Sequence, residues 1–259
     1  MSAPVKLAGF AALLVLVFGV AVAAGDVIGP DRQASEIPQP GMGEHGAVDP
    51  IRGLSIAEGG LSLEVAETSP ELVFTIRGED GEAVRDFEVE HERRMHLIVV
   101  RRDGTGFQHL HPELGADGAW RTPLTLPEPG AYRVFADFNH DGTSYTLAAD
   151  VTVDGAATYR SFPAPASADT TDGYDVRMRA DGEQLRFDIT RGGAPVETEE
   201  YLGAGGHLVA LREGDLAFLH VHPNDDGVSF EADLEPGTRY LLYLQFQHEG
   251  RVHTAELVR

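Results

Sequence analysis

The sequence predicts an all-β protein: two tandem antiparallel β-sandwich modules, immunoglobulin- or cupredoxin-like, behind an N-terminal hydrophobic helix. Short runs of alternating apolar and polar residues recur along the chain, and turn signals such as Asp-Gly and Pro-Gly separate them. No stretch after Ala24 keeps a helical period for three turns. Short strands at this spacing, each with one apolar face, are typical of sandwiches.

The first 24 residues predict export from the cytoplasm. Residues 7–24, LAGFAALLVLVFGVAVAA, are uncharged and mainly apolar, and Lys6 precedes them. As a helix they would measure about 27 Å, close to the ~30 Å hydrocarbon core of a bilayer. A secretory signal cut after Ala21-Val22-Ala23 and an uncleaved membrane anchor with Lys6 on the cytoplasmic side remain alternatives. Both predict an extracytoplasmic protein, either membrane-anchored or secreted.

The folded part is predicted to begin after a spacer. Residues 25–52 are rich in Gly, Pro, Asp and Glu without an apolar period, which predicts a flexible linker. A second stretch of small residues and proline, 155–172, predicts a linker between the modules, which are then residues 53–154 and 173–259. Three alternating runs predict strands of the first module: 61–65, 72–76 and 132–138.

The composition of the chain limits its chemistry. Its 259 residues include 20 Lys and Arg against 42 Asp and Glu, a formal net charge of −22, which leaves no basic surface for nucleic acid. The absence of cysteine excludes disulfides, thiolate zinc sites, iron–sulfur clusters, a cysteine nucleophile and the cysteine-ligated blue-copper centre. Any metal site must therefore use imidazole, carboxylate or methionine ligands.

An internal repeat carries most of the eleven histidines. Three pairs of aligned segments define it: MHLIVVR (95–101) with GHLVALR (206–212), FQHLHP (107–112) with FLHVHP (218–223), and FNHDG (138–142) with FQHEG (246–250). His109 follows His96 by 13 residues, and His220 follows His207 by the same 13. The two modules therefore share one histidine pattern, which indicates a duplicated unit.

The two HxHP segments of the repeat are the strongest candidates for metal ligands. In a strand, residues i and i+2 point to the same face, so each segment presents two imidazoles side by side. With one or two imidazoles from adjacent strands, they could supply the three or four nitrogen ligands that suit Cu(II) or Zn(II). Met95 could add a soft ligand in the first copy only, because its counterpart is Gly206. The pattern allows one site in each module or one site shared between them.

Two other interpretations fit the same pattern. Phe107, His109 and His111 share a strand face, so the histidines could instead hydrogen-bond within a sandwich core. The protein would then be a membrane-tethered interaction or scaffold module. A metal-dependent enzyme would need an acid or base beside the metal. The acidic candidates, none of them in a catalytic motif, are Asp137, Asp215 and Asp226. The chain has no G-x-S-x-G segment either, and we expect no enzymatic activity.

The segments MHLIVVRRDGTGFQHLHP, GHLVALREGDLAFLHVHP and YLQFQHEG resemble a known family. It comprises two-module, histidine-rich proteins of high-GC Gram-positive bacteria, secreted or membrane-anchored and described as heavy-metal-binding. It extends to the single-module YtkA-like extracytoplasmic sandwich domains. The resemblance implies metal positions at His96, His109, His111, His207, His220, His222 and His248. His140 stands where that family is not expected to carry a histidine.

These observations predict an extracytoplasmic, non-enzymatic protein that binds copper or zinc through duplicated histidines. Its expected partners are the metal ion, the membrane through the N-terminal helix, and an extracytoplasmic protein, but not nucleic acid. The alternative is a membrane-tethered sandwich module whose histidines are structural.

Overall fold

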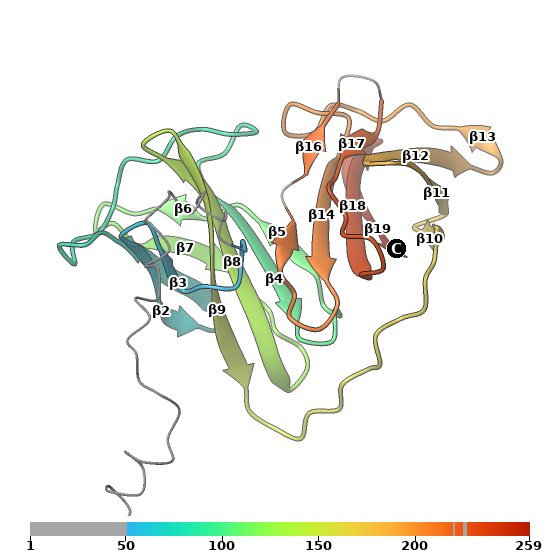
Figure 1. The fold of residues 1–259 in the computed structure, drawn as a ribbon. Helices are drawn as coiled ribbons and strands as arrows, with labels where there is room; N and C mark the ends of the chain where they lie inside the picture. Colours follow the sequence, from blue (N-terminus) through green and yellow to red (C-terminus); the bar gives the residue numbers. More distant parts are fainter. Residues whose placement is uncertain (1–50, 220, 225–226) are drawn as a thin grey trace, which may run out of the picture. The chain divides into compact units, whose positions relative to one another are not determined.

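Two antiparallel β-sandwiches follow one another along the chain, and the all-β prediction is confirmed (Figure 1). The computed structural model describes residues 51–219, 221–224 and 227–259. The helix expected within 1–24 and most of the linker expected for 25–52 lie outside these residues. Within the described residues, no helix is long and apolar enough to cross a membrane.

The first sandwich consists of a five-stranded and a four-stranded antiparallel sheet. The strand orders are β1-β2-β3-β7-β6 and β5-β4-β8-β9. The strands are β1 (Ala57–Glu58), β2 (Leu61–Thr68), β3 (Glu71–Arg77), β4 (His96–Arg101), β5 (Gln108–Leu110), β6 (Glu113–Leu114), β7 (Trp120–Pro123), β8 (Gly130–His140) and β9 (Thr143–Val153).

The second sandwich repeats this plan with a six-stranded and a four-stranded sheet. The orders are β10-β11-β12-β17-β16, with β13 also paired to β12, and β15-β14-β18-β19. The strands are β10 (Ala168–Thr171), β11 (Tyr174–Asp181), β12 (Gln184–Arg191), β13 (Ala194–Pro195), β14 (His207–Arg212), β15 (Phe218–Leu219), β16 (His222–Pro223), β17 (Ser229–Glu231), β18 (Tyr240–His248) and β19 (Arg251–Val258).

Each sandwich encloses its own hydrophobic core between its two sheets. The predicted alternation is visible in β3, where Leu72, Phe74 and Ile76 are fully buried and the residues between them are half-buried. They pack with Trp120 in the first core, and Phe246 lies in the second. The period of two thus separates the core face of each strand from its outer face.

A third apolar cluster joins the two sandwiches through their four-stranded sheets. β4 is buried along its whole length because both of its faces are covered. Leu97 and Val99 pack in the first core, whereas Ile98 and Val100 pack in the cluster with Val209 of β14. Burial of apolar surface contributes about 25 cal/mol per Å², so this cluster favours docking of the modules.

The contact between the sandwiches is reciprocal. Phe107 of the first stacks on Tyr243 of the second, with ring centroids 4.1 Å apart, and Phe218 of the second packs against Phe135 of the first at 5.6 Å. The repeat makes Phe107 the counterpart of Phe218. Phe135 and Tyr243 are counterparts because they occupy the same register position beside β4 and β14. The modules therefore use the same surface against each other, as subunits of a two-fold dimer do.

Candidate metal centre

Three histidines of the first module converge where its four-stranded sheet meets the second module. His96 is the first residue of β4, His109 lies in the neighbouring β5, and His111 follows it by two residues. The register pairs His109 with Ile98, so alternation places the three imidazoles on the face that Ile98 turns towards the second module. One nitrogen from each ring lies within 4.8 Å of the others. The structure thus brings three of the predicted site residues together.

The centroids of the three imidazole rings are about as far apart as those of imidazoles bound to one ion. The ring centroids lie 5.3 Å apart for His96 and His109, 5.1 Å for His96 and His111, and 4.8 Å for His109 and His111. With metal–nitrogen bonds of about 2.0–2.1 Å, two imidazoles at tetrahedral positions have centroids roughly 5 Å apart. The centroid spacing is thus compatible with one shared ion, while the ring nitrogens, within 4.8 Å of one another, would have to approach to roughly 3.3 Å to bind it tetrahedrally.

With the side-chain amide of Gln245 oriented as in the structure, hydrogen bonds assign the lone pairs of the ring nitrogens. Nε2 of His96 donates to the carbonyl oxygen of Glu90 at 3.1 Å, and Nδ1 of His109 donates to Oε1 of Gln245 at 2.6 Å. Both acceptors are oxygens without a proton, so Nδ1 of His96 and Nε2 of His109 are the unprotonated nitrogens of neutral rings. These two nitrogens face each other at 3.0 Å. In addition, Nε2 of His111 is buried without a hydrogen-bond partner.

Burial keeps the imidazoles of this region neutral. It lowers the pKa of His111 and of His207 to about 4 and is the main cause in both cases. Burial likewise lowers the pKa of His96 and holds that of His109 well below its usual range. The neighbouring His96 and His111 lower the pKa of His109 further. At neutral pH the lone pairs are therefore available to a metal ion rather than to protons.

The second module contributes His207 to the same region. Its Nε2 donates to the carbonyl oxygen of Tyr201 at 3.1 Å, which repeats the bond between His96 and Glu90. The His207 ring centroid lies 6.2 Å from that of His96 and 6.1 Å from that of His109, about 1 Å farther than the three converging rings are from one another. His207 thus lies next to the cluster but is not one of its three converging imidazoles.

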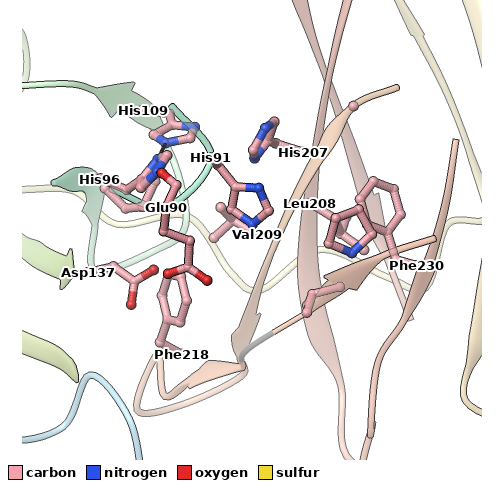
Figure 2. A pocket seen from close by; sticks show the side chains of 14 residues that line it. Glu90, His91, His96, His109, Asp137, His207, Leu208, Val209, Phe218 and Phe230 are labelled. Atoms are coloured by element: carbon pink, nitrogen blue, oxygen red, sulfur yellow. Dashed lines mark hydrogen bonds between the residues drawn. The ribbon is translucent and has the colours of Figure 1, made fainter. Parts of the chain in front are cut away.

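A cavity of about 60 Å³ lies beside these histidines, between the two modules (Figure 2). Its apolar wall includes Val209, Phe218 and Phe230. Its polar wall is formed by Glu90, His91, His96, His109, Asp137 and His207. Asp137 accepts a hydrogen bond from Thr146 at 2.6 Å, and burial raises the pKa of its carboxyl group. The cluster thus has space beside it for an ion and its water.

The other predicted ligands are placed differently. His248 lies at the end of β18, where its Nδ1 is 2.8 Å from the hydroxyl of Tyr174, and the structure does not bring it to the cluster. His220 lies outside the described residues. The backbone of His222 lies in β16, opposite Glu231, and its side chain is outside the described part of the chain.

Met95 does not serve as a soft ligand, and that expectation was wrong. Its side chain is 1% exposed and packs in the core of the first sandwich. Because alternation sends neighbouring residues of a strand to opposite faces, Met95 and His96 point away from each other. His140 also stays apart, with its Nδ1 donating to the carbonyl oxygen of Asp86 at 2.7 Å.

A hairpin turn before β4 supplies groups that the repeat pattern did not reveal. Glu90 and Arg93 exchange two backbone hydrogen bonds, and the residues between them, His91 and Glu92, have φ angles of 47° and 62°. Such left-handed conformations are costly for residues other than glycine and often occur near functional sites. The turn directs the Glu90 carbonyl to His96 and places His91 on the cavity wall. Nothing in the sequence marks His-Glu as a turn of this kind.

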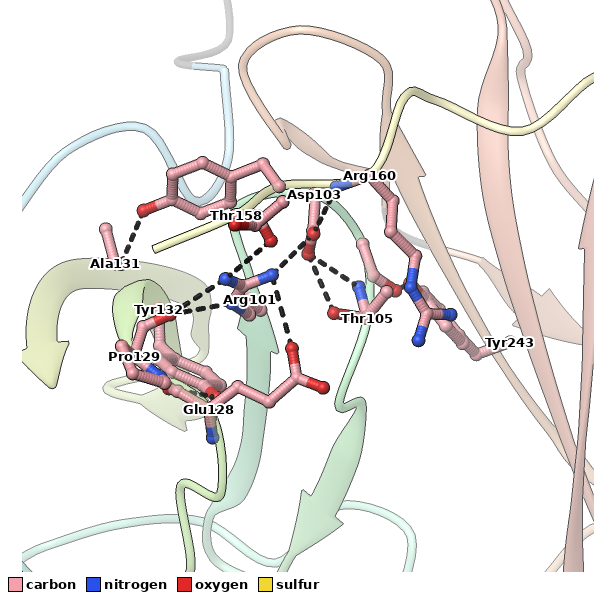
Figure 3. Close-up of polar contacts among 12 residues, drawn as sticks. Arg101, Asp103, Thr105, Glu128, Pro129, Ala131, Tyr132, Thr158, Arg160 and Tyr243 are labelled. Carbon is pink, nitrogen blue, oxygen red and sulfur yellow. Dashed lines mark hydrogen bonds and ion pairs between the residues drawn. The ribbon is translucent and has the colours of Figure 1, made fainter. Parts of the chain in front are cut away.

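The segment after β9 is tied down by a buried arginine, away from the histidines (Figure 3). Arg101 is 1% exposed and pairs with Asp103 at 2.6 Å. It also donates to the carbonyl oxygens of Pro129 and Thr158 and lies over the ring of Tyr159, 4.5 Å from its centroid. The residues predicted as an inter-module linker are thus held by the first module along part of their length.

A family model for a domain of unknown function, DUF8832, matches residues 56–155 and 169–259. The chain belongs to the DUF8832 family. The two matched segments contain the two sandwiches, in agreement with the internal repeat. Membership of DUF8832 carries no statement about metals, so the finer resemblance to heavy-metal-binding and YtkA-like proteins remains a prediction.

Comparison with other proteins adds little to the DUF8832 assignment. No curated protein matches the chain. The FN1–FN3 domains of chicken CNTN1 align over 80% of this chain and 68% of theirs, with 12% identity and a TM-score of 0.22. A mouse coronavirus receptor-binding domain complexed with its murine receptor aligns over 76% of this chain and 98% of that one, with 7% identity and a TM-score of 0.17. At these TM-scores neither likeness supports a functional statement about this chain.

Proposed function

We propose that the protein binds a copper or zinc ion outside the cytoplasm, at the cluster of His96, His109 and His111, with His207 as the fourth imidazole. The observation that carries this proposal is the convergence of three imidazoles, with one nitrogen of each within 4.8 Å of the others and Nε2 of His111 buried without a hydrogen-bond partner. The extracytoplasmic location is inferred from residues 1–24 alone.

With the Gln245 amide oriented as in the structure, the lone pairs of Nδ1 of His96 and Nε2 of His109 face each other at 3.0 Å, and a cation between them would remove their repulsion. A proton is a poor candidate because burial lowers the pKa of both rings. A structural histidine normally finds a hydrogen-bond partner for each buried ring nitrogen, yet Nε2 of His111 has none. A divalent ion that accepts all three lone pairs satisfies His96, His109 and His111 together.

The donor set favours copper or zinc over other ions. Imidazole nitrogens suit Cu(II) and Zn(II), whereas Ca²⁺ and Mg²⁺ prefer oxygen ligands. With no cysteine in the chain, thiolate does not compete, and Met95 is buried elsewhere. We infer a binding role rather than catalysis, because Asp137, the acid on the cavity wall, is held by Thr146 and belongs to no catalytic motif.

Calorimetric titration of the full chain, purified in mild detergent and freed of metal, tests this function. We expect Cu(II) or Zn(II) to bind with a dissociation constant below about 1 µM. The double variant His109→Ala/His111→Ala should bind at least about 100-fold more weakly, because it loses two of three ligands. His140→Ala, outside the cluster, is the matched control.

Two results would contradict the proposal: no binding to the wild-type chain, or equal binding to the double variant. The scaffold alternative makes a different prediction. If the histidines are only structural, the double variant lowers the melting temperature by the same amount with and without a chelator. A site that binds metal in the native state makes that difference depend on the metal.

A further inference from the structure

The hydrogen bond between His109 and Gln245 joins the candidate metal centre to the opposite module. We propose that Gln245 is a positioning residue for His109, so that metal affinity depends on the docking of the second sandwich onto the first. This inference rests on the metal-binding function proposed above.

The amide of Gln245 lies between Thr254 and His109 and bonds to both. Gln245 lies in β18 and is 7% exposed. Its Nε2 donates to Oγ1 of Thr254 on the adjacent strand at 3.3 Å, which leaves Oε1 directed at His109. Oε1 then accepts the Nδ1 proton of His109 at 2.6 Å. Both hydrogen-bond partners of the Gln245 amide, Thr254 and His109, are partly buried, so water does not readily replace them.

This bond determines how His109 presents itself to a metal. An acceptor at Nδ1 fixes the tautomer with the lone pair on Nε2, holds the ring plane and raises the basicity of Nε2. Removal of such an outer partner typically lowers metal affinity 10–100-fold. Since Gln245 comes from the second module, the site in the first module is incomplete when the modules separate.

The dependence must be mutual. If docking strengthens metal binding by some factor, metal binding strengthens docking by the same factor. The contacts that would couple metal binding to docking lie next to the hydrogen bond between His109 and Gln245. Tyr243 stacks on Phe107, and each of these rings lies two residues before one partner of that hydrogen bond. The hydroxyl of Tyr243 also donates to the carbonyl oxygen of Gly104. Metal binding and module docking therefore act on one continuous surface.

The first module provides a guide to the conservative substitution. Asp137 pairs with His96 in the register as Gln245 pairs with His207, so the two are counterparts. Each bonds a threonine of the adjacent strand, Asp137 as the acceptor from Thr146 and Gln245 as the donor to Thr254. A carboxylate is thus accommodated at this position of the fold. Burial raises the pKa of the Asp137 carboxyl group, so a Glu at position 245 would bind the Nδ1 proton of a metal-ligating imidazole more strongly than an amide does only in its ionised form.

The test compares Gln245→Leu with Gln245→Glu in the full chain by calorimetry and by electron paramagnetic resonance of the Cu(II) form. Leu should weaken Cu(II) binding 10–100-fold, because it removes the acceptor. Glu should bind at least as tightly as wild type, with an altered copper spectrum and a lower Cu(II)/Cu(I) potential. Gln247→Leu, on the same strand but bonded to Glu199, is the matched control and should leave affinity and spectrum unchanged.

The docking arm uses Leu241→Ala, which removes a side chain of the apolar cluster between the sandwiches that lies at Gly104 of the first module and does not line the cavity. We expect weaker Cu(II) binding and faster hydrogen exchange in β14, which metal should slow again. Wild-type affinity and spectrum in Gln245→Leu would overturn the inference while leaving the metal site intact. Loss of Cu(II) binding in Gln245→Glu as severe as in Gln245→Leu would also overturn the inference. It would show that any change of packing at this position weakens binding, whether or not the acceptor is kept. A wild-type chain that binds no copper would instead overturn the proposed function itself.

Discussion

Acidification is predicted to destabilise the metal-free protein well above the pH at which carboxylates titrate. The imidazoles of His111 and His207 have a pKa of about 4 in the folded protein, against about 6.5 when unfolded. Between these values the unfolded chain binds more protons than the native one, so stability falls as the pH falls. The contribution of these rings is fully present above about pH 6.5 and is lost towards pH 4.

The size of the effect follows from the two pKa values. At pH 5, proton linkage gives about 2 kcal/mol for each ring, and solvent screening of these partly exposed groups reduces this to about 1 kcal/mol. His111 and His207 together then cost about 2 kcal/mol between pH 7.5 and pH 5. The lowered pKa values of His96 and His109 add to it in the same direction. For a protein of this size the change corresponds to roughly 4–8 °C in melting temperature.

The assay is thermal and urea unfolding in chelator at pH 7.5 and pH 5.0. Wild type should lose about 2 kcal/mol or more, and the double variant His111→Asn/His207→Asn should lose markedly less. His140→Asn, whose ring lies outside the cluster, should behave like wild type. An identical loss in wild type and the double variant, or a protein that gains stability at pH 5, would refute the reasoning.

Two further substitutions test the surrounding structure. Glu92→Gly, at a φ of 62° where the second module has Gly203, should stabilise the chain by about 0.5–1 kcal/mol in urea unfolding without changing metal affinity, and a destabilised variant would show that the turn carries no strain. Arg101→Met should cost about 3 kcal/mol or more and speed proteolysis within residues 156–165, because it leaves Asp103 buried without its ion-pair partner. The exposed Arg177→Met is its control, and equal effects of the two would contradict the role given to Arg101.

The fold was readable from the sequence because each strand obeys a local rule. Alternation in segments such as β3 reports one buried face, and Gly-containing turns separate the strands. The same rule, with the HxHP spacing, accounts for the convergence of His109 and His111 beside His96. The continuous apolar run of β4 also indicates the docking of the second module, because a strand that is apolar on both faces packs against another layer on each face.

The parts of the site that escaped prediction depend on contacts between distant segments. Nothing in the sequence around Gln245 distinguishes it from other polar residues of β18, because its contact with His109 forms only where the two sandwiches dock. His91 reaches the cavity through a left-handed turn that its residue type does not suggest. His248 repeats the position of His140 in the sequence, but its place at the far end of β18 depends on the full register of the strand, which spacing alone does not give.

X-ray absorption of the copper-loaded or zinc-loaded chain, after removal of loosely bound metal, tests the metal site most directly. We expect three or four nitrogen neighbours at about 2.0 Å with the multiple scattering of imidazole, and loss of that shell in His109→Ala/His111→Ala. A shell of oxygen ligands alone, or an imidazole shell that survives in the double variant, would contradict it.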